Sequence, residues 1–150
     1  FQKIIEESPA PNLPRELRDR ICTAAVELAA SAKYRNAGTV EFILAPDGEF
    51  YFLEMNTRLQ VEHPVTEMVC GVDLVEAQLR VAAGEGLPWK QSDLKQTGHA
   101  IECRICCEEP EHDFRPATGA ARLLRLPEGD GVRFDGGIRQ GQAITAAFDS

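Results

Sequence analysis

The chain has 150 residues, 43% apolar and 27% charged, a composition that is typical of a globular protein and excludes a disordered one. A formal net charge of −8 argues against non-specific nucleic-acid binding and against binding to an anionic membrane. Five cysteines without the spacing of a disulfide framework, and no apolar run long enough to span a bilayer, favour the bacterial cytoplasm or the mitochondrial matrix. Because the chain begins at Phe1 rather than at an initiator Met, we expect it to be cut from a longer protein.

The spacing of apolar residues and the positions of Gly and Pro predict a chain of mixed helices and strands. Pro14 suits the first turn of a helix, and apolar residues follow it at helical spacing. Asp73 suits a helix N-cap, and Gly84 suits a helix end. In chain order, the predicted elements are a strand over 2–7, a helix over 14–33, β-rich runs over 38–44 and 49–56, a helical turn after Pro64, a helix over 74–83, a polar linker over 86–98, and strands over 99–107, 120–126, 131–134 and 142–148.

Asp47-Gly48 between two β-rich runs predicts a hairpin with a two-residue turn. In that register Glu41 lies opposite Glu54, and Thr39 lies opposite Asn56. Facing carboxylates repel each other and weaken a sheet. A magnesium ion would relieve the repulsion, since it takes one or two carboxylates together with substrate phosphates, and Asn56 would add a third oxygen. The alternative is an exposed sheet face with solvated charges, and spacing alone leaves both readings open.

Arg58, Gln60 and Glu62 alternate just after this hairpin. A guanidinium holds a small planar oxyanion with two parallel hydrogen bonds, and a nearby carboxylate can remove a proton as a general base. His63 is the rival base. The alternative is a polar loop in which an Arg–Glu pair contributes little stability.

Three further charged residues can be explained from the sequence without a functional role. Glu102 and Arg104 share one face of the predicted strand 99–107, where a surface ion pair would explain them. Lys3 is a single cation on the predicted first strand, a position at which lysines are commonly solvated.

The sequence EMNTRLQVEHPVTEM (54–68) resembles the signature of biotin carboxylases, which are ATP-grasp enzymes. The similarity extends over FQKIIEESPAP (1–11), GTVEFIL (38–44), GVDLVEAQLRVAAGE (71–85) and GHAIECRI (98–105). The resemblance implies an α+β fold. Residues 1–90 would form the C-terminal part of an ATP-grasp domain, an antiparallel sheet with helices. Residues 97–150 would form the β-rich start of the biotin carboxylase C-terminal domain.

By the same resemblance, the hairpin residues would serve ATP. Glu41 and Glu54 would hold Mg²⁺ (or Mn²⁺) on the ATP phosphates, with Asn56 beside them. Lys3 would lie near the bicarbonate and phosphate end of the site.

The residues after the hairpin would serve bicarbonate and biotin. Arg58 would bind bicarbonate, together with Gln60 and the backbone of Val61. Glu62 would take the bicarbonate proton, so that the oxyanion attacks the γ-phosphate of ATP and forms carboxyphosphate. Arg104 would stabilise the biotin enolate that attacks the released carbon dioxide.

The resemblance also implies partners: a biotin carboxyl carrier domain and a carboxyltransferase. The sequences EMNTR and EHPVTE look more like acyl-CoA carboxylases than like pyruvate carboxylase. The isolated chain would hold about half of an active site and is expected to be inactive. The alternatives are another ATP-grasp ligase, of the pyruvate carboxylase or carbamoyl-phosphate synthetase type, and a non-catalytic scaffold that binds nucleotide or a carrier domain.

Overall fold

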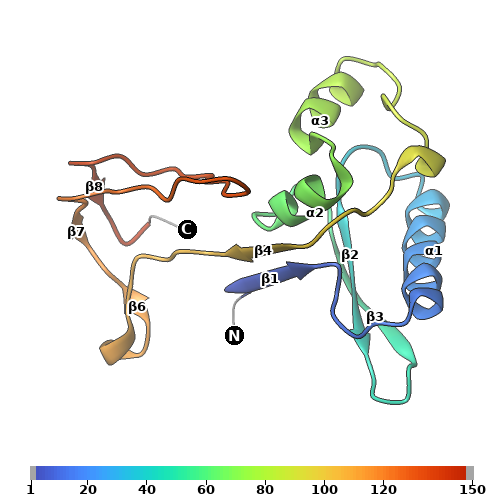
Figure 1. Cartoon of the computed structure of the whole chain (residues 1–150), viewed down its shortest axis with the longest axis horizontal. Coiled ribbons are helices and arrows are strands. Elements are labelled where there is room, and N and C mark those ends of the chain that lie inside the picture. The colour runs from blue at the N-terminus through green and yellow to red at the C-terminus, as the bar shows by residue number, and fades with distance from the viewer. Residues whose placement is uncertain (1–2, 148–150) are drawn as a thin grey trace. The chain divides into compact units, whose positions relative to one another are not determined.

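The computed structural model describes residues 3–147, which fall into two units, Lys3–Cys103 and the residues from Arg104 onward. The first unit contains β1 (Ile5–Ser8), α1 (Arg15–Ser31), β2 (Thr39–Leu44), β3 (Phe50–Asn56), α2 (His63–Cys70), α3 (Leu74–Ala82), the short 3₁₀ helix η1 (Gln91–Asp93) and β4 (Ala100–Cys103) (Figure 1). Helices combined with small antiparallel sheets confirm the predicted α+β class. None of the described helices has the length and apolar character needed to cross a membrane.

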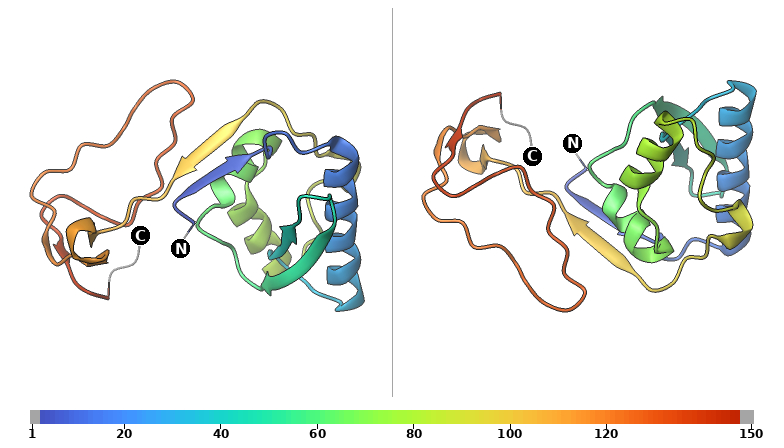
Figure 2. Two further views of the ribbon diagram at one scale, coloured as in Figure 1. Left: turned by 90° about the horizontal axis from the view of Figure 1, so that it is seen from below. Right: turned by 90° about the horizontal axis from the view of Figure 1, so that it is seen from above.

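Helix α1 begins one residue after Pro14, close to the predicted start. The Pro14 carbonyl accepts the first intrahelical bond, from Arg18 N–H at 3.0 Å, and the fixed φ of −57° of the proline suits a residue at this boundary. Figures 1 and 2 show α1 lying beside the β2–β3 hairpin. The helix and the hairpin meet where the Arg20 guanidinium carbon lies 5.4 Å from the centroid of the Phe50 ring.

The β2–β3 hairpin turns through three residues, Pro46–Gly48, so the predicted two-residue turn is wrong. Ala45 N–H donates to Glu49 O at 2.8 Å, and Gly48 N–H donates to Ala45 O at 3.0 Å. Pro46 has no N–H to pair across the ladder, and its fixed φ suits the second position of a type I turn. Gly48 then takes a φ of +86°, which is the left-handed residue that ends such a loop.

A β-bulge restores the predicted pairing of the two hairpin carboxylates. Phe42 pairs with Phe52, whereas Glu41 pairs with Glu54, so that Leu53 is the extra residue. The predicted pairing of Glu41 with Glu54 is therefore confirmed, because the shifted turn and the bulge cancel. The bulge also places Phe52 and Glu54 on opposite faces of the hairpin, because their partners Phe42 and Glu41 are neighbours on β2.

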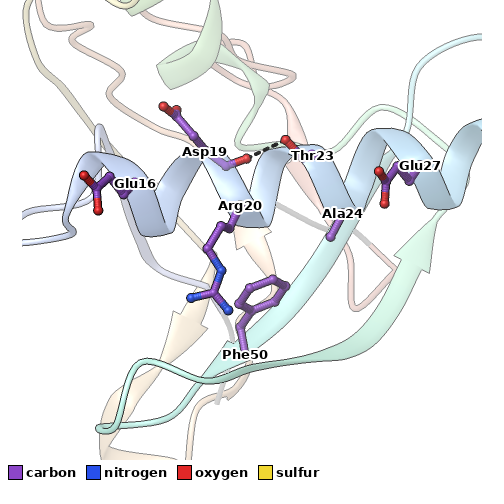
Figure 3. A pocket seen from close by; sticks show the side chains of 7 residues that line it. All are labelled: Glu16, Asp19, Arg20, Thr23, Ala24, Glu27 and Phe50. Atoms are coloured by element: carbon purple, nitrogen blue, oxygen red, sulfur yellow. Dashed lines mark hydrogen bonds between the residues drawn. The ribbon is translucent and has the colours of Figure 1, made fainter.

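One face of the hairpin is aromatic and lies towards α1. The Phe42 ring meets Phe50 and Phe52 edge-on, with centroid distances of 5.5 and 6.4 Å. Figure 3 shows Phe50 pointing towards α1 beside Arg20. The carboxylates of Glu41 and Glu54 consequently lie on the face of the hairpin that is turned away from α1.

The small core of the first unit lies between α2 and the β1–β4 pair. Val65 and Val69 of α2 are buried with Ala100 of β4. Helix α2 packs against both β4 and β1, which Figure 2 shows as neighbouring antiparallel strands. This packing fixes the start of α2, where the predicted bicarbonate residues end.

Helix α3 has the predicted N-cap. The Asp73 carboxylate accepts the Glu76 N–H at 2.7 Å, and the chain leaves the helix through Gly84 at a φ of +86°. The predicted helix over 74–83 is confirmed to within one residue.

The substitution Asp73→Ala is expected to lower the free energy of unfolding of the chain by about 1 kcal/mol, because it removes the side-chain acceptor of the cap. Urea unfolding followed by circular dichroism measures the change. Asp73→Asn is the matched control, since an Asn side chain caps equally well. Equal losses in both variants would show that the cap is not the cause.

The second unit contains only short paired segments among its described residues. These are β5 (Glu108–Glu109), β6 (Arg115–Pro116), β7 (Gly119–Ala120) and β8 (Ala143–Ile144), with a 3₁₀ turn η2 (Pro110–His112). The predicted strand over 131–134 is wrong, and the predicted strand over 120–126 is reduced to its first residue. Extended segments become strands only where a partner pairs their backbone groups, and here β7 pairs with β8 for two residues. The end of the predicted strand 142–148 lies outside the described residues.

Candidate functional site

Lys3 joins two carboxylates that come from different elements. Its ammonium group forms an ion pair with Glu41 of β2 and donates to Glu62 Oε1 at 2.9 Å. The side chains of Glu41 and Glu62 are largely buried, with 17% and 18% exposed, whereas that of Lys3 is 41% exposed. Of the two readings of Lys3, a solvated lone cation on the first strand is wrong, whereas its place near the bicarbonate end of the site stays a prediction. Lys3 precedes β1 and is doubly paired.

Two amides connect Glu41 to the neighbouring predicted residues. Asn56 Nδ2 and Gln60 Nε2 each donate to Glu41 Oε1 at 3.0 Å, and Asn56 Nδ2 also donates to Glu54 Oε1 at 2.9 Å. Asn56 thus places its nitrogen between the two carboxylates, where an oxygen ligand was expected, because a donor there lowers their repulsion. We call this set the carboxylate cluster: Lys3, Glu41, Glu54, Asn56, Gln60 and Glu62.

The ion pairs keep Lys3, Glu41 and Glu62 charged over a wide pH range. The hydrogen bonds from Lys3 and then Gln60 lower the pKa of Glu41. Burial is the largest effect on Glu62 and acts to raise its pKa, but the hydrogen bond from Lys3, the backbone hydrogen bond at Glu62 and the charge of Lys3 together lower the pKa. For Lys3, burial acts to lower the pKa, and the bonds to both carboxylates raise it above 10.5. The carboxylates therefore stabilise the fold above pH 4.5 and lose this effect as the pH falls through their lowered pKa values.

Glu6 is a further acid near the cluster that the sequence did not indicate. It lies on β1 directly opposite Glu102 of β4. Burial, followed by the negative charge of Glu62, raises the pKa of Glu6. The facing pair depends on strands far apart in the chain, so no local pattern predicts it. An ionised Glu6 is less stable in the folded chain than in the unfolded chain, and it opposes folding at neutral pH.

The substitution Glu6→Gln is therefore expected to raise the free energy of unfolding of the chain at pH 7. The pKa of Glu6 is raised in the folded state, so the wild type loses stability only once Glu6 ionises. The difference in the free energy of unfolding between E6Q and the wild type should therefore vanish below pH 4.5. Urea unfolding at pH 4, 5.5 and 7 measures the gap. Glu27→Gln, in an exposed position on α1, should show no such pH dependence. A gap that persists at pH 4 would contradict the electrostatic cause.

Arg58 lies in the turn between β3 and α2 and is exposed. Its Nη1 donates to the Leu59 carbonyl at 3.2 Å, and its charge contributes to the lowered pKa of Glu41. Within residues 3–147 it forms no ion pair with Glu62, which pairs with Lys3 instead, so the Arg–Glu pair of the polar-loop alternative is not formed. The guanidinium is left at the surface beside the cluster.

His63 turns both ring nitrogens towards the protein. Nδ1 lies 2.8 Å from the Gln60 carbonyl oxygen, and Nε2 lies 4.0 Å from Glu67 Oε2. This arrangement does not suit the rival general base. Arg104 is the first residue after β4 and belongs to the second unit, so its role stays a prediction.

A separate hollow opens on the α1 side of the hairpin (Figure 3). It is lined by Glu16, Asp19, Arg20, Thr23, Ala24, Glu27 and Phe50. None of these residues belongs to the carboxylate cluster, which lies on the other face of the hairpin.

The helices and small antiparallel sheets match part of the ATP-grasp fold of solved biotin carboxylase structures. Residues 1–90 match the family model "Carbamoyl-phosphate synthase L chain, ATP binding domain", and residues 102–150 match "Biotin carboxylase C-terminal domain". The chain belongs to the biotin carboxylase family of ATP-grasp proteins. The domain limits predicted from sequence, at 90 and 97, stay a prediction.

Curated relatives of several kinds match the chain over 99% of its length. It is 53% identical to a pyruvate carboxylase subunit of Methanothermobacter thermautotrophicus and covers 30% of it. It is 51% identical to the biotin carboxylase of a Nostoc species and covers 33% of it. It is 51% identical to a mitochondrial methylcrotonoyl-CoA carboxylase subunit of mouse and covers 21% of it. The chain thus spans a third or less of these relatives.

Solved structures match the fold closely. The biotin carboxylase domain of a thermophilic 2-oxoglutarate carboxylase, bound to bicarbonate, is 44% identical with a TM-score of 0.94; the match covers 99% of this chain and 34% of that one. The corresponding domain from Hydrogenobacter thermophilus, in complex with MgADP and bicarbonate, matches with a TM-score of 0.93, 44% identity, and 99% and 33% coverage. Pyruvate, acyl-CoA and 2-oxoglutarate carboxylases all occur among the matches, so they do not separate these acceptors.

Proposed function

We propose that the parent of this chain is a biotin carboxylase, which uses ATP and bicarbonate to carboxylate biotin on a carrier domain. Family membership supports this function. The carboxylate cluster supports separate roles for its members, some for bicarbonate and others for the metal ion on ATP. The observation that carries the proposal is a buried acceptor in the cluster. Gln60 is 7% exposed, and its Oε1 has no hydrogen-bond partner within residues 3–147.

A buried acceptor left without a donor costs about 1–3 kcal/mol, so this oxygen favours a ligand that brings an O–H group. The hydroxyl of bicarbonate is such a group. The Gln60 Nε2 donates a hydrogen bond to Glu41. This bond fixes the orientation of the carboxamide, so that its oxygen points away from Glu41. Lys3 and Arg58 supply the positive charge that an anion needs beside so many carboxylates.

Glu62 is the proposed base. Its lowered pKa keeps it ionised at neutral pH, so it can accept the bicarbonate proton. The deprotonated oxygen then forms a bond to the γ-phosphorus of ATP while the bond to ADP breaks, which gives carboxyphosphate. Lys3 lies against Glu62 and would neutralise the charge that gathers between base, bicarbonate and phosphate. Arg104 would stabilise the biotin enolate that attacks the carbon dioxide released from carboxyphosphate.

Glu41 and Glu54 are the proposed metal ligands, with Asn56 beside them. The described residues contain no group of three His, Cys, Asp or Glu side chains placed to hold a metal ion by themselves. Two facing carboxylates still suit Mg²⁺ (or Mn²⁺), which binds one or two carboxylates together with substrate phosphates. When bound, the ion supplies positive charge to the ATP phosphates.

The test is ADP release by the full-length parent. Release should require bicarbonate and should rise when free biotin is added, but not when ammonia is added. Stimulation by ammonia would favour a carbamoyl-phosphate synthetase type of ligase. A rate that does not depend on bicarbonate would favour the nucleotide-binding scaffold and overturn the proposal.

Within the family, we propose an acyl-CoA carboxylase as the parent, acting with a biotin carboxyl carrier domain and a carboxyltransferase. The sequences EMNTR and EHPVTE support this assignment. Transfer of labelled carboxyl groups from the complete assembly to acyl-CoA, and not to pyruvate or 2-oxoglutarate, would be the expected result.

A further inference from the structure

His63, at the start of α2, holds the backbone of the turn that carries Gln60 and Glu62. Its Nδ1 lies 2.8 Å from the Gln60 carbonyl oxygen, and its backbone N–H donates to the same oxygen at 3.3 Å. Because a carbonyl oxygen only accepts hydrogen bonds, Nδ1 is the ring nitrogen that carries the hydrogen. One residue therefore fixes the Gln60 carbonyl with two donors.

The other side of the imidazole is backed by a buried carboxylate. Glu67 is 6% exposed, and its Oε2 lies 4.0 Å from His63 Nε2. Its Oε1 accepts the Leu74 N–H, the first N–H of α3, at 2.5 Å. Glu67 shares α2 with Val65 and Val69, whose side chains form the core. His63 is the first residue of α2, and the packing of Val65 and Val69 in the core fixes the position of this helix and so of the His63 ring.

The peptide that His63 holds also contains the N–H of Val61. In a planar trans peptide the C=O and the N–H point in opposite directions, so fixing the Gln60 carbonyl aims the Val61 N–H away from His63. This N–H forms no hydrogen bond within residues 3–147. An aimed, unused backbone donor next to Glu62 is a ready ligand for an anion.

We propose that His63 is a positioning residue, which acts through the Gln60–Val61 peptide to aim the Val61 N–H at bound bicarbonate. The inference rests on the proposed function, because the anion is bicarbonate only if the parent is a biotin carboxylase. His63 itself does not touch bicarbonate. Replacement of His63 should therefore lower kcat/KM for bicarbonate and leave the KM for ATP unchanged.

The test compares His63→Asn with His63→Gln in the full-length parent. An Asn side chain places a donor near the position of Nδ1, whereas a Gln side chain places one near Nε2. H63N should keep kcat/KM for bicarbonate within about twofold, and H63Q should lower it about tenfold. This decrease in kcat/KM is smaller than the roughly 10²–10³-fold decrease in kcat that follows removal of an oxyanion donor. The Val61 N–H remains in H63Q, but its orientation is no longer fixed. The KM for ATP should not change in either variant.

His99→Gln is the matched control, since His99 is 46% exposed and pairs with Glu7. Equal values of kcat/KM for bicarbonate in H63N and H63Q would overturn the inference. A rise in the KM for ATP in H63Q as large as the decrease in kcat/KM for bicarbonate would also overturn it. If H63Q does not fold, His63→Ala serves in its place with the same expected loss. A wild-type parent without bicarbonate-dependent ADP release would overturn the proposed function, and the inference with it.

Discussion

Glu62→Gln in the full-length parent is expected to lower bicarbonate-dependent ADP release by about 10²–10⁴-fold, the usual contribution of a positioned general base. The carboxamide keeps the shape of the side chain and accepts a hydrogen bond from Lys3, but it cannot take a proton. Binding of ATP should be largely kept, because Glu62 is proposed to serve bicarbonate and the hairpin carboxylates are proposed to serve the nucleotide. Steady-state kinetics together with calorimetric titration of ATP separates the two.

Glu49→Gln is the matched control, because Glu49 is an exposed residue directly after the hairpin turn and belongs to none of the proposed machinery. It should leave the rate unchanged. If E62Q retained the wild-type rate, Glu62 would not be the base. Equal losses of ATP binding and rate would indicate damage to the fold rather than to proton transfer.

Lys3→Met is expected to move the acidic limb of the pH–rate profile of the parent to higher pH, in addition to lowering the rate. Lys3 is the main group that lowers the pKa of Glu62 against the opposing effect of burial. Without the ammonium group, burial and the charge of Glu41 would raise that pKa, so a larger fraction of the base would be protonated near neutral pH. The profile of kcat/KM for bicarbonate reports this shift.

Lys95→Met is the control for the loss of one positive charge at an exposed position. Its profile should coincide with that of the wild type. A K3M profile that is lowered but not shifted would show that Lys3 binds substrate without acting on Glu62.

The elements of this fold that depend on local pattern were predictable from sequence. The spacing of apolar residues located α1, and Asp73 with Gly84 bounded α3. Asp47-Gly48 locates the hairpin but not its turn, because Pro46 favours the second position of a type I turn and so extends the loop to three residues. A bulge inside a strand leaves little trace in the sequence.

The candidate site was predictable as a set of residues but not as a set of contacts. Alternation and family resemblance identified Glu41, Glu54 and Glu62. That Lys3 would join Glu41 to Glu62 depends on how β1 is placed beside β4 and α2, which is a matter of tertiary packing. The same packing brings Glu6 opposite Glu102, and no pattern near residue 6 indicates it.

In the proposed function, an oxygen of bicarbonate attacks the γ-phosphate of ATP at the carboxylate cluster. Turnover of the parent with ¹⁸O-labelled bicarbonate tests it directly, because the oxygen that bonds to phosphorus stays with the phosphate when carboxyphosphate releases carbon dioxide. Mass spectrometry of the product should find one ¹⁸O atom in each inorganic phosphate. Phosphate without ¹⁸O would show that water attacks ATP instead, and would contradict the account.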